Sequence, residues 1–469
     1  MSLWKPHNYQ MTAVSFLLSN PTSGLFLDPG LGKTSITLAT INILKNCDEI
    51  GGVLIVAPMR VIYSVWPNEV EKWDNFNGIT HTILHGKDKE KNLDGPQKDL
   101  YLINPEGLPW LLEHLRDRVR EKKEHPFDTL WVDESTKFKS PTAKTRFKTL
   151  SILLPLFKRR HIMTGTPAPN GFIDLWSQIY LLDEGKALRS NFYQFRNYYF
   201  QTEDWNRYTH KLRPGSKGMI EQAIAPLVLE MSAEKYLSMP SLVYNNLEIT
   251  LPKQVQRHYK EMEHELFTEL DGEKITAQAT VAAAMKCHQI ANGAVYKQVD
   301  TASGVPVREV VKVHRGKVEA LGDLIDELNG KPLLVAYYYK HDLEAIRQFL
   351  GKDIPHIGSG VSPDEVDEIQ KKWNGGLLSI LVANPSSMSH GLNLQGACND
   401  VCWFSLTWNL EEYQQFIRRV YRQGVSGSVR VHHIVAKDTI DEAMLYRLGD
   451  KAKKQTDLRN ALSLYRTIK

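Results

Sequence analysis

The sequence of 469 residues has few cysteines and no long apolar run. Its four cysteines, Cys47, Cys287, Cys398 and Cys402, form no C-x-x-C pair, which argues against a disulfide framework and favours a reducing compartment. No second ligand pair lies near Cys398 and Cys402, so we interpret them as small buried side chains rather than half of a zinc site. No apolar stretch approaches the roughly 18 residues of a membrane span, and the first residues lack the apolar core of a signal peptide. We therefore expect a cytoplasmic protein that contacts no membrane.

A strong excess of one charge sign is also missing. The 58 Lys and Arg residues against 54 Asp and Glu residues leave a net charge of +4, which permits a polyanionic partner without requiring one. Hydrophobic residues make up 42% and charged residues 24%, values that exclude a disordered or fibrous chain. A chain of this length is expected to form two or more domains.

What the sequence does contain is two series of short apolar runs, each typical of strands buried on both faces. Helical or polar stretches separate the runs, so each series predicts βαβ units and a parallel sheet. The runs are residues 25–27, 53–57, 100–103, 130–132 and 161–164 in the first series and residues 333–337, 377–383, 401–404 and 429–435 in the second.

Residues 176–320 contain few such runs and many helical patterns. We therefore predict an α/β fold of two parallel-sheet lobes in tandem, lobe 1 over residues 1–175 and lobe 2 over residues 321–445. Residues 176–320 are predicted to be helical insertions and a linker packed partly on both lobes. Residues 446–469 are predicted to form a brace helix.

The first chemical motif is Asp-Pro-Gly-Leu-Gly-Lys-Thr at residues 28–34, between an expected strand and an expected helix. Glycine amides and a helix N-terminus bind phosphate in that setting. We expect Gly30 and Gly32 to face the phosphates of ATP, Lys33 to reach the β- and γ-phosphates, and Thr34 to ligate Mg²⁺. A leucine replaces the first glycine of the strict phosphate-loop pattern, so the prediction depends on the flanking strand and helix.

Two carboxylates, Asp133 and Glu134, follow the expected strand at residues 129–132. Open α/β sheets bind ligands at the carboxyl ends of their strands. With a phosphate loop upstream, we expect Asp133 to hold Mg²⁺ and Glu134 to orient and deprotonate the attacking water. The plainer alternative is an acidic turn. Residues 164–170 end the next strand and offer a hydrogen-bonding joint near the γ-phosphate, or simply a proline-rich turn.

Near the far end of the chain, Arg419 and Arg422 are three residues apart and would project from one face of a helix. Bidentate guanidinium groups match the charge on a phosphoryl group in transit, so we expect both to be catalytic. An exposed basic helix is the alternative.

A basic stretch between residues 137 and 160 contains eight Lys or Arg residues and no acidic one. Such runs are usually solvated faces. This run lies between two expected nucleotide motifs, so we predict that it contacts a phosphate backbone, with Lys137 and Lys139 among the contacts.

An aromatic stretch at residues 189–207 allows two interpretations. The spacing of Phe192, Phe195 and Tyr199 is helical and favours core packing. Stacking of the rings on bases is the alternative.

The order of these motifs resembles the Swi/Snf-type ATPases of helicase superfamily two, most closely the compact stand-alone versions of bacteriophages and prophages, from about residue 7 to residue 455. Residues 28–34, 133–134 and 164–170 are similar to motifs I, II and III of that family. The resemblance implies two RecA-like lobes with ATP in the cleft between them.

Further segments are similar to family motifs. Asn8-Tyr-Gln10 is similar to the glutamine motif, so Gln10 is implied to read adenine. Residues 53–58, with the side chains Trp66, Glu69 and Trp73, are similar to motif Ia. Residues 390–395 are similar to motif V and residues 415–424 to motif VI.

The resemblance also implies roles for these motifs. Gln415 joins the two arginines in the catalytic set. Implied contacts with nucleic acid are Pro58, Arg60, Thr166, Gly391 and Asn393. The family's Asp-Glu-Ala-His reads Asp-Glu-Ser-Thr here, which puts the residue that bridges to motif III in question.

The family implies a nucleic-acid-stimulated ATPase that translocates on DNA, with duplex DNA favoured, in replication, recombination or repair. We expect a monomer with ATP and Mg²⁺ as cofactors and with phage or host replication or recombination proteins as partners. A phage-encoded protein would act in the bacterial cytoplasm. The alternatives are a strand-separating helicase on DNA or RNA and a non-catalytic adaptor switched by nucleotide. The intact Lys33, Glu134 and arginines argue against the adaptor.

Overall fold

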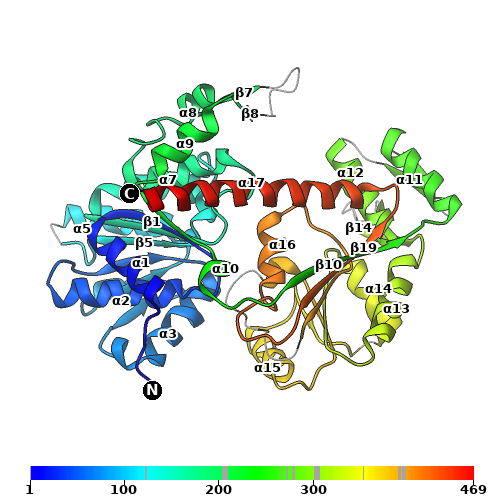
Figure 1. The fold of residues 1–469 in the computed structure, drawn as a ribbon, viewed down its shortest axis with the longest axis horizontal. Helices are drawn as coiled ribbons and strands as arrows, with labels where there is room; N and C mark the ends of the chain where they lie inside the picture. The colour runs from blue at the N-terminus through cyan, green and yellow to red at the C-terminus, as the bar shows by residue number, and fades with distance from the viewer. Residues whose placement is uncertain are drawn as a thin grey trace. The chain divides into compact units, whose positions relative to one another are not determined.

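A computed structural model describes residues 2–121, 124–202, 210–265, 267–270, 273–276, 280–299, 307–351, 353–388, 392, 394 and 398–468. The chain divides into two compact units, each with its own parallel sheet (Figure 1). Unit 1 comprises residues 1–237 and 451–469, and unit 2 comprises residues 238–450.

The sheet of unit 1 has the strand order β3-β4-β2-β5-β6-β1-β9, and all its pairings are parallel. Its strands are β1 (Thr22–Leu27), β2 (Val53–Val56), β3 (His81–Ile83), β4 (Leu100–Ile103), β5 (Thr129–Asp133), β6 (Arg159–Thr164) and β9 (Val228–Met231).

The sheet of unit 2 has the strand order β10-β19-β18-β15-β17-β16, again with parallel pairings throughout. Its strands are β10 (Leu242–Ile249), β15 (Leu333–Ala336), β16 (His356–Ile357), β17 (Ile380–Ala383), β18 (Asp400–Trp403) and β19 (Val429–Ala436). The predicted α/β fold of two parallel-sheet lobes is confirmed.

Helices connect the strands within each sheet. Those of unit 1 are α1 (Asn8–Ser19), α2 (Lys33–Asn46), α3 (Trp66–Lys72), α4 (Lys89–Asp94), α5 (Leu108–Arg120), α6 (Thr149–Leu153), α7 (Leu175–Asp183), α8 (Phe192–Tyr199), α9 (Ser216–Ile224) and α10 (Ala233–Tyr236). Those that begin in unit 2 are α11 (Lys253–Glu265), α12 (Thr280–Asn292), α13 (Gly316–Leu328), α14 (Lys340–Leu350), α15 (Pro363–Asn374), α16 (Leu410–Ile417) and α17 (Ile440–Ile468).

Both sheets carry completely buried strands, as their apolar runs predict. In unit 1, alternate strand residues such as Phe26, Val56 and Val132 face a core that also takes side chains from α5 and α7. In unit 2, Val335, Val382 and Cys402 pack with apolar side chains of α13 and α14. Cys398 is also buried, so the two cysteines occupy the interior positions expected of them.

The segment over residues 176–320 differs from the predicted helical insertion, because it contributes strands to both sheets. β9 is the edge strand beside β1, and β10 is the edge strand beside β19. The described residues of this segment also form three antiparallel strand pairs. Their strands are β7 (Phe200–Thr202) with β8 (His210–Leu212), β11 (Phe267–Leu270) with β12 (Glu273–Thr276), and β13 (Ala294–Val299) with β14 (Val307–Lys312).

The last helix, α17, begins at Ile440, earlier than the brace helix predicted from residue 446. Across the described residues, every helix is too short or too polar to cross a membrane.

Candidate nucleotide-binding site

The phosphate loop lies where β1 ends and α2 begins. Gly32 is the N-cap of α2, with a left-handed φ of 79°, and Gly30 has a φ of 91°. Residues with a side chain are strained in this region of backbone conformation, so the turn itself requires both glycines. Lys33 opens the helix, and its Nζ donates a hydrogen bond to the carbonyl oxygen of Leu27 at 2.9 Å.

Gln10 of α1 lies against the same loop. Its buried side chain donates from Nε2 to the carbonyl oxygen of Leu31 at 3.1 Å, and its Oε1 accepts from the backbone N–H of His7 at 2.9 Å. A Cβ added to Gly32 would lie 2.5 Å from Gln10 Nε2. Gln10 therefore supports the loop from behind, while its role in reading adenine stays a prediction.

Asp133 is the last residue of β5, and its neighbours set its charge. Its Oδ2 accepts a hydrogen bond from Trp66 Nε1 at 3.2 Å. Burial and the adjacent Glu134 raise the pKa of Asp133 to about 6, against the lowering effect of Lys33 and the Trp66 hydrogen bond. The positive charge of Lys33 is therefore too small to offset the burial of Asp133 and the neighbouring carboxylate.

A magnesium ion would supply that charge. The predicted ligands, Thr34 and Asp133, offer a hydroxyl and a carboxylate oxygen, and Mg²⁺ is commonly held by one or two carboxylates together with substrate phosphates. Among the described residues, no group of three or more His, Cys, Asp and Glu side chains could hold a metal by itself. The donor set fits a cation that arrives with a nucleotide.

Glu134 turns the chain sharply after β5, with a φ of 59° and a ψ of 61°. Its Oε1 accepts hydrogen bonds from Thr136 Oγ1 and Thr164 Oγ1, both at 3.0 Å. Thr164 Oγ1 in turn accepts from the backbone N–H of Thr166 at 3.1 Å. The carboxylate expected to activate water is thus hydrogen-bonded to the turn at residues 164–170. This turn also contacts the phosphate loop, because a Cβ on Gly165 would lie 2.9 Å from Pro29 Cδ.

A second link between these segments was missed by the sequence analysis. Ser135 donates from Oγ to Oε1 of Gln178 in α7 at 2.7 Å. Gln178 Nε2 donates to the carbonyl oxygens of Pro167 and Asp174 at 2.7 and 2.8 Å. Both Ser135 and Gln178 are completely buried. Gln178 therefore bridges motif II to motif III, in the place left open by the unusual Asp-Glu-Ser-Thr sequence.

The motif Ia side chains join this site as well. Glu69 Oε1 accepts from Ser35 Oγ of α2 at 2.5 Å and from Trp73 Nε1 at 2.8 Å. Together with the bond from Trp66 to Asp133, these contacts fix α3 against the phosphate-binding helix. The predicted nucleic-acid contacts Pro58 and Arg60 are partly buried and precede α3.

The basic stretch at residues 137–160 is less free than its sequence indicates. At least four of its eight cations form ion pairs with carboxylates distant in sequence, which reduces its value as a phosphate-binding surface. These pairs are Arg146 with Glu106, Lys158 with Asp128, Arg159 with Glu49 and Arg160 with Glu184. Lys137 and Lys139 are partly buried beside motif II, and Thr166 is buried.

In unit 2, Arg419 and Arg422 follow the end of α16 instead of lying on a helix, which corrects the predicted helical face. They still converge. Arg419 Nη1 and Arg422 Nη2 donate to the carbonyl oxygen of Leu392 at 2.7 and 3.5 Å. Gln415 is buried in α16 and donates from Nε2 to Glu411 Oε1 at 3.3 Å.

Gly391 and Asn393 lie outside the described residues. The convergence of the two arginines with Lys33 around one triphosphate stays a prediction.

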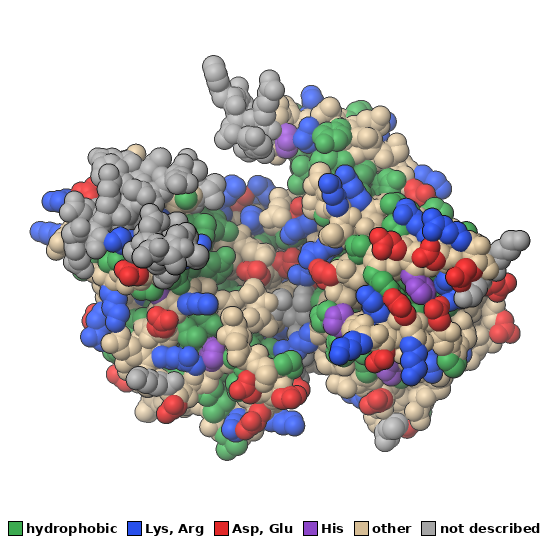
Figure 2. Space-filling model, turned by 180° about the vertical axis from the view of Figure 1, so that it is seen from behind, with side chains coloured by type: hydrophobic (Ala, Val, Ile, Leu, Met, Phe, Trp, Pro, Cys, Tyr) green, Lys and Arg blue, Asp and Glu red, His purple; other side chains and the backbone are tan. Residues whose placement is uncertain are grey.

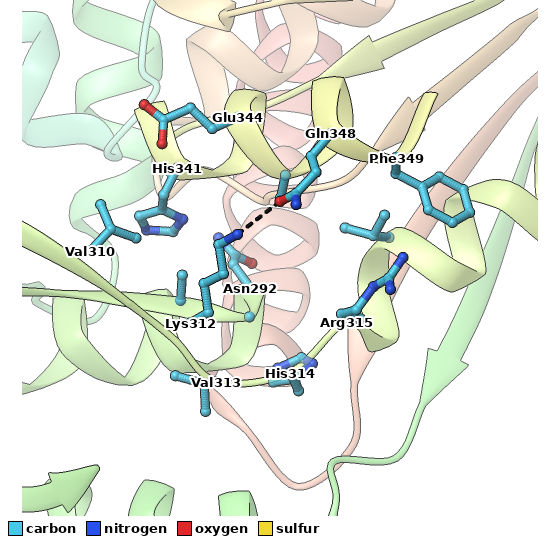
Figure 3. A pocket seen from close by; sticks show the side chains of 14 residues that line it. Asn292, Val310, Lys312, Val313, His314, Arg315, His341, Glu344, Gln348 and Phe349 are labelled. Carbon is cyan, nitrogen blue, oxygen red and sulfur yellow. Dashed lines mark hydrogen bonds between the residues drawn. The ribbon is translucent and has the colours of Figure 1, made fainter. Parts of the chain in front are cut away.

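Unit 2 also contains a pocket of about 570 Å³ between β14, the start of α13 and α14 (Figure 3). Lys312 crosses it and donates to Gln348 Oε1 at 2.8 Å. None of the predicted site residues is among the described residues that line it, so it is separate from the motifs above.

Comparison with known proteins agrees with the order of motifs. The model of the SNF2-related domain matches residues 9–297, and that of the helicase conserved C-terminal domain matches residues 316–424. "Putative protein p41" of Acyrthosiphon pisum secondary endosymbiont phage 1 is 32% identical over 98% of this chain and 99% of its own length.

More distant relatives are longer. The ATP-dependent DNA helicase DDM1 of Arabidopsis thaliana is 22% identical over 95% of this chain, which spans 61% of that protein. A solved structure of the Sulfolobus solfataricus SWI2/SNF2 ATPase core in complex with dsDNA aligns over 98% of this chain and 95% of its own at 23% identity, with a TM-score of 0.43. The family match extends over more than half of the chain and the phage relative over nearly all of it, so the chain belongs to the SNF2-related family of DNA-dependent ATP hydrolases.

Proposed function

We propose that the protein binds ATP with Mg²⁺ at the phosphate loop and couples its hydrolysis to translocation along duplex DNA. The observation that carries the proposal is the hydrogen-bonded chain from Glu134 through Thr164 to the backbone of Thr166. It joins the carboxylate that would activate water to a turn that would contact the DNA through Thr166.

Residues of unit 1 would bind the nucleotide. Gly30, Gly32 and the start of α2 would receive the phosphates, and Lys33 would exchange the carbonyl of Leu27 for phosphate oxygens. Mg²⁺, held by Thr34 and Asp133, would neutralise charge on the phosphates. Glu134 would then take a proton from the attacking water, with its orientation fixed by Thr136 and Thr164.

The DNA end is supported by the relatives. The Arabidopsis protein is named an ATP-dependent DNA helicase, and other relatives are named chromatin-remodeling ATPases. These names support DNA as the ligand; the duplex form of the track and a role in replication, recombination or repair are our proposals from the family resemblance. We further propose a cytoplasmic monomer.

ATP turnover with and without DNA tests the proposal. Duplex DNA should stimulate hydrolysis many-fold, and Lys33→Ala or Glu134→Gln should reduce the stimulated rate by about 100-fold or more. Single-stranded DNA, forked DNA and RNA are the comparison substrates. An unstimulated rate equal to the rate with DNA would contradict the proposal.

Displacement assays then separate the possible outputs. A translocase should displace a protein roadblock, or a third strand bound to the duplex, and leave the two duplex strands paired. Strand separation on a fork would assign helicase activity instead.

A further inference from the structure

The chain between α7 and β9 forms an arm on unit 1, made of α8, β7, β8 and α9. One side of the arm packs into the core through Phe195, Tyr199 and Phe200, with Ile220 and Ile224 of α9 beside them. This packing accounts for the helical aromatic stripe of the sequence. It leaves a second side of the arm exposed to solvent.

The exposed side is basic. In the described part of the arm, residues 184–202 and 210–227, two side chains are acidic, Glu184 and Glu221, and Glu184 is ion-paired with Arg160 outside the arm. Six side chains are basic: Lys186, Arg189, Arg196, Lys211, Arg213 and Lys217. The chain as a whole is nearly balanced, at 58 basic against 54 acidic residues, so this excess is local. In the space-filling view, Lys and Arg side chains in blue and apolar side chains in green lie beside one another on this part of unit 1 (Figure 2). A surface with an excess of positive charge attracts a polyanion.

Two tyrosines accompany these cations on the surface. Tyr193 is 58% exposed and Tyr198 is 47% exposed, so both rings are accessible to a ligand. The guanidinium of Arg189 lies 4.2 Å from the ring centre of Tyr198, and that of Arg196 lies 5.2 Å from the ring centre of Tyr193. Each ring is thereby held in place next to a positive charge, an arrangement suited to a base and its phosphate.

A hollow of about 400 Å³ lies between the end of α8 and the strands β7 and β8, and Arg196, which contacts the Tyr193 ring, is one of its lining residues. Arg196, Arg213 and His210 line it together with amide and hydroxyl side chains, and no described carboxylate does. Arg213 donates from Nε to the carbonyl oxygen of Phe200 at 3.0 Å and from Nη2 to that of Asn197 at 3.2 Å, which fixes its guanidinium at the rim. Burial and Arg196 lower the pKa of His210, as expected in a positive field.

We propose that this arm is a second nucleic-acid contact that binds single-stranded DNA, with its arginines on the phosphates and Tyr193 and Tyr198 stacked on unpaired bases. Paired bases inside a duplex present no free face to these rings, so the ligand differs from the duplex track. The proposal rests on the proposed DNA motor and adds to it a second, single-stranded ligand.

Fluorescence anisotropy of the full chain with a labelled single-stranded oligonucleotide, and with the duplex of the same sequence, tests the proposal. Tyr193→Ala with Tyr198→Ala should weaken single-strand binding by about tenfold or more and leave duplex binding within about twofold. Tyr193→Phe with Tyr198→Phe keeps both rings and should bind like the wild type. Duplex-stimulated ATP hydrolysis, measured on the same samples, should be equal for both double variants.

The outcomes are distinguishable. Equal single-strand affinities of the alanine and phenylalanine variants, or a wild type that binds duplex only, would overturn the proposal and leave the motor intact. Displacement of the oligonucleotide by polyglutamate at equal charge concentration would overturn it in favour of an acidic protein partner. If DNA does not stimulate ATP hydrolysis but single-strand binding still depends on the two rings, the proposed motor function is wrong and the arm is still a DNA-binding surface.

Discussion

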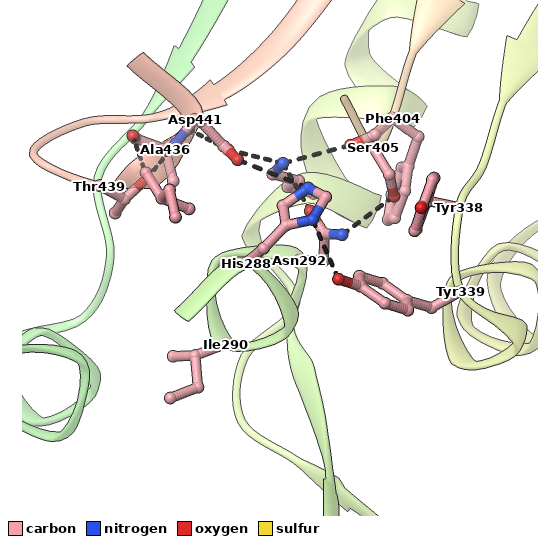
Figure 4. Close-up of polar contacts among 12 residues, drawn as sticks. His288, Ile290, Asn292, Tyr338, Tyr339, Phe404, Ser405, Ala436, Thr439 and Asp441 are labelled. Carbon is pink, nitrogen blue, oxygen red and sulfur yellow. Dashed lines mark hydrogen bonds and ion pairs between the residues drawn. The ribbon is translucent and has the colours of Figure 1, made fainter. Parts of the chain in front are cut away.

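The two units differ in how their buried charges are compensated. In unit 2, Lys317 and Asp441 are both completely buried and form an ion pair with 2.7 Å between Nζ and Oδ2. Figure 4 shows Asp441 with the polar side chains around it. Lys317 Nζ also donates to Asn292 Oδ1 at 2.7 Å, and the backbone N–H of Ala436 donates to Asp441 Oδ2 at 3.1 Å. Each charge meets an opposite charge and further hydrogen bonds.

This cluster joins segments that are far apart in the sequence. Asn292 ends α12, Lys317 begins α13, and Asn292 Nδ2 donates to Ser405 Oγ after β18 at 3.0 Å. His288 lies beside it, hydrogen-bonded through Nδ1 to Tyr339 Oη at 3.1 Å, and burial lowers the pKa of His288 to about 4. Asp441 Oδ1 and His288 Nε2 lie 3.9 Å apart and are both buried without a hydrogen bond, so the cluster pairs its charges but leaves these two atoms unsatisfied. Its other contacts hold distant segments of unit 2 together.

The nucleotide site of unit 1 is arranged differently. Asp133 and Glu134 are adjacent carboxylates, and the raised pKa of Asp133 shows that Lys33 does not compensate for its burial and its neighbour. Removing one partner of a buried ion pair leaves the other charge uncompensated, whereas a buried charge that already lacks compensation is ready for a cation and a nucleotide. The same Asp→Asn substitution in the two places should therefore have opposite effects.

The largest effect is expected for Asp441→Asn. It leaves the buried Lys317 ammonium without its counter-charge, which costs about 3–5 kcal/mol of unfolding free energy. Urea denaturation followed by circular dichroism measures the loss. Asp438→Asn is the matched control, because Asp438 is exposed and its φ of 56° suits asparagine, so about 0.5 kcal/mol or less is expected there. A loss below about 1 kcal/mol for Asp441→Asn would show that the ion pair with Lys317 is not needed for stability.

Asp133→Asn should instead stabilise the protein. Burial and Glu134 raise the pKa of Asp133 from its ordinary 3.8 to about 6, so the folded chain binds this proton more tightly than the unfolded chain. The contribution of this group to stability is present below about pH 4 and is lost as the pH rises to about 6, by at most about 3 kcal/mol.

The variant tests this sign directly. Without nucleotide, it should match the wild type near pH 4 and exceed its unfolding free energy at pH 7 to 8, while losing ATP hydrolysis. Parallel denaturation series at these pH values measure the difference. A variant that is less stable than the wild type at pH 8 would show that Asp133 is already compensated.

The sequence predicted the features that depend on neighbouring residues. Apolar runs identified most strands of both sheets, and Lys33, Asp133 and Glu134 were located by their position at strand ends. It missed β10, whose residues are mostly exposed, because an edge strand needs no apolar run. It missed β9, whose four buried residues stand in a helical context.

The missed contacts join residues that are distant in the sequence. Ser135 and Gln178 are 43 positions apart, and Arg159 and Glu49 are 110 apart, so no local pattern reports either pair. The eight cations of residues 137–160 looked unpaired for the same reason. Charge patterns in a sequence show which residues are charged, and only the fold shows which of them are neutralised.

Gly32→Ala should weaken ATP binding by about tenfold. The left-handed backbone strains an alanine by about 1–2 kcal/mol, and the alanine Cβ would also lie 2.5 Å from Gln10 Nε2. Gly30→Ala introduces the backbone strain alone, because nothing lies within 4 Å of the added Cβ, so its effect on ATP binding should be smaller.

Isothermal titration calorimetry with a non-hydrolysable ATP analogue compares the two substitutions. Adding Gln10→Ala to Gly32→Ala should recover the part of the loss that is due to the contact. Equal losses for the two single alanine variants would show that the loop is not held against Gln10.

The smallest effect is expected at the buried bridge between motifs II and III. Gln178→Leu removes the acceptor of Ser135 and the donor to Pro167, and each lost hydrogen bond is worth about 1 kcal/mol. The bridge touches neither the phosphate loop nor Glu134, so ATP affinity and the unstimulated rate should stay close to wild type. The stimulation by duplex DNA should fall a few-fold, because motif III is no longer held to the strand that carries the carboxylates. Ser135→Ala with Gln178→Leu also removes the Ser135 hydroxyl that the single variant leaves unpaired, so it should recover part of the stability but not the stimulation. A double variant that regains full stimulation would reduce the bridge to a packing contact.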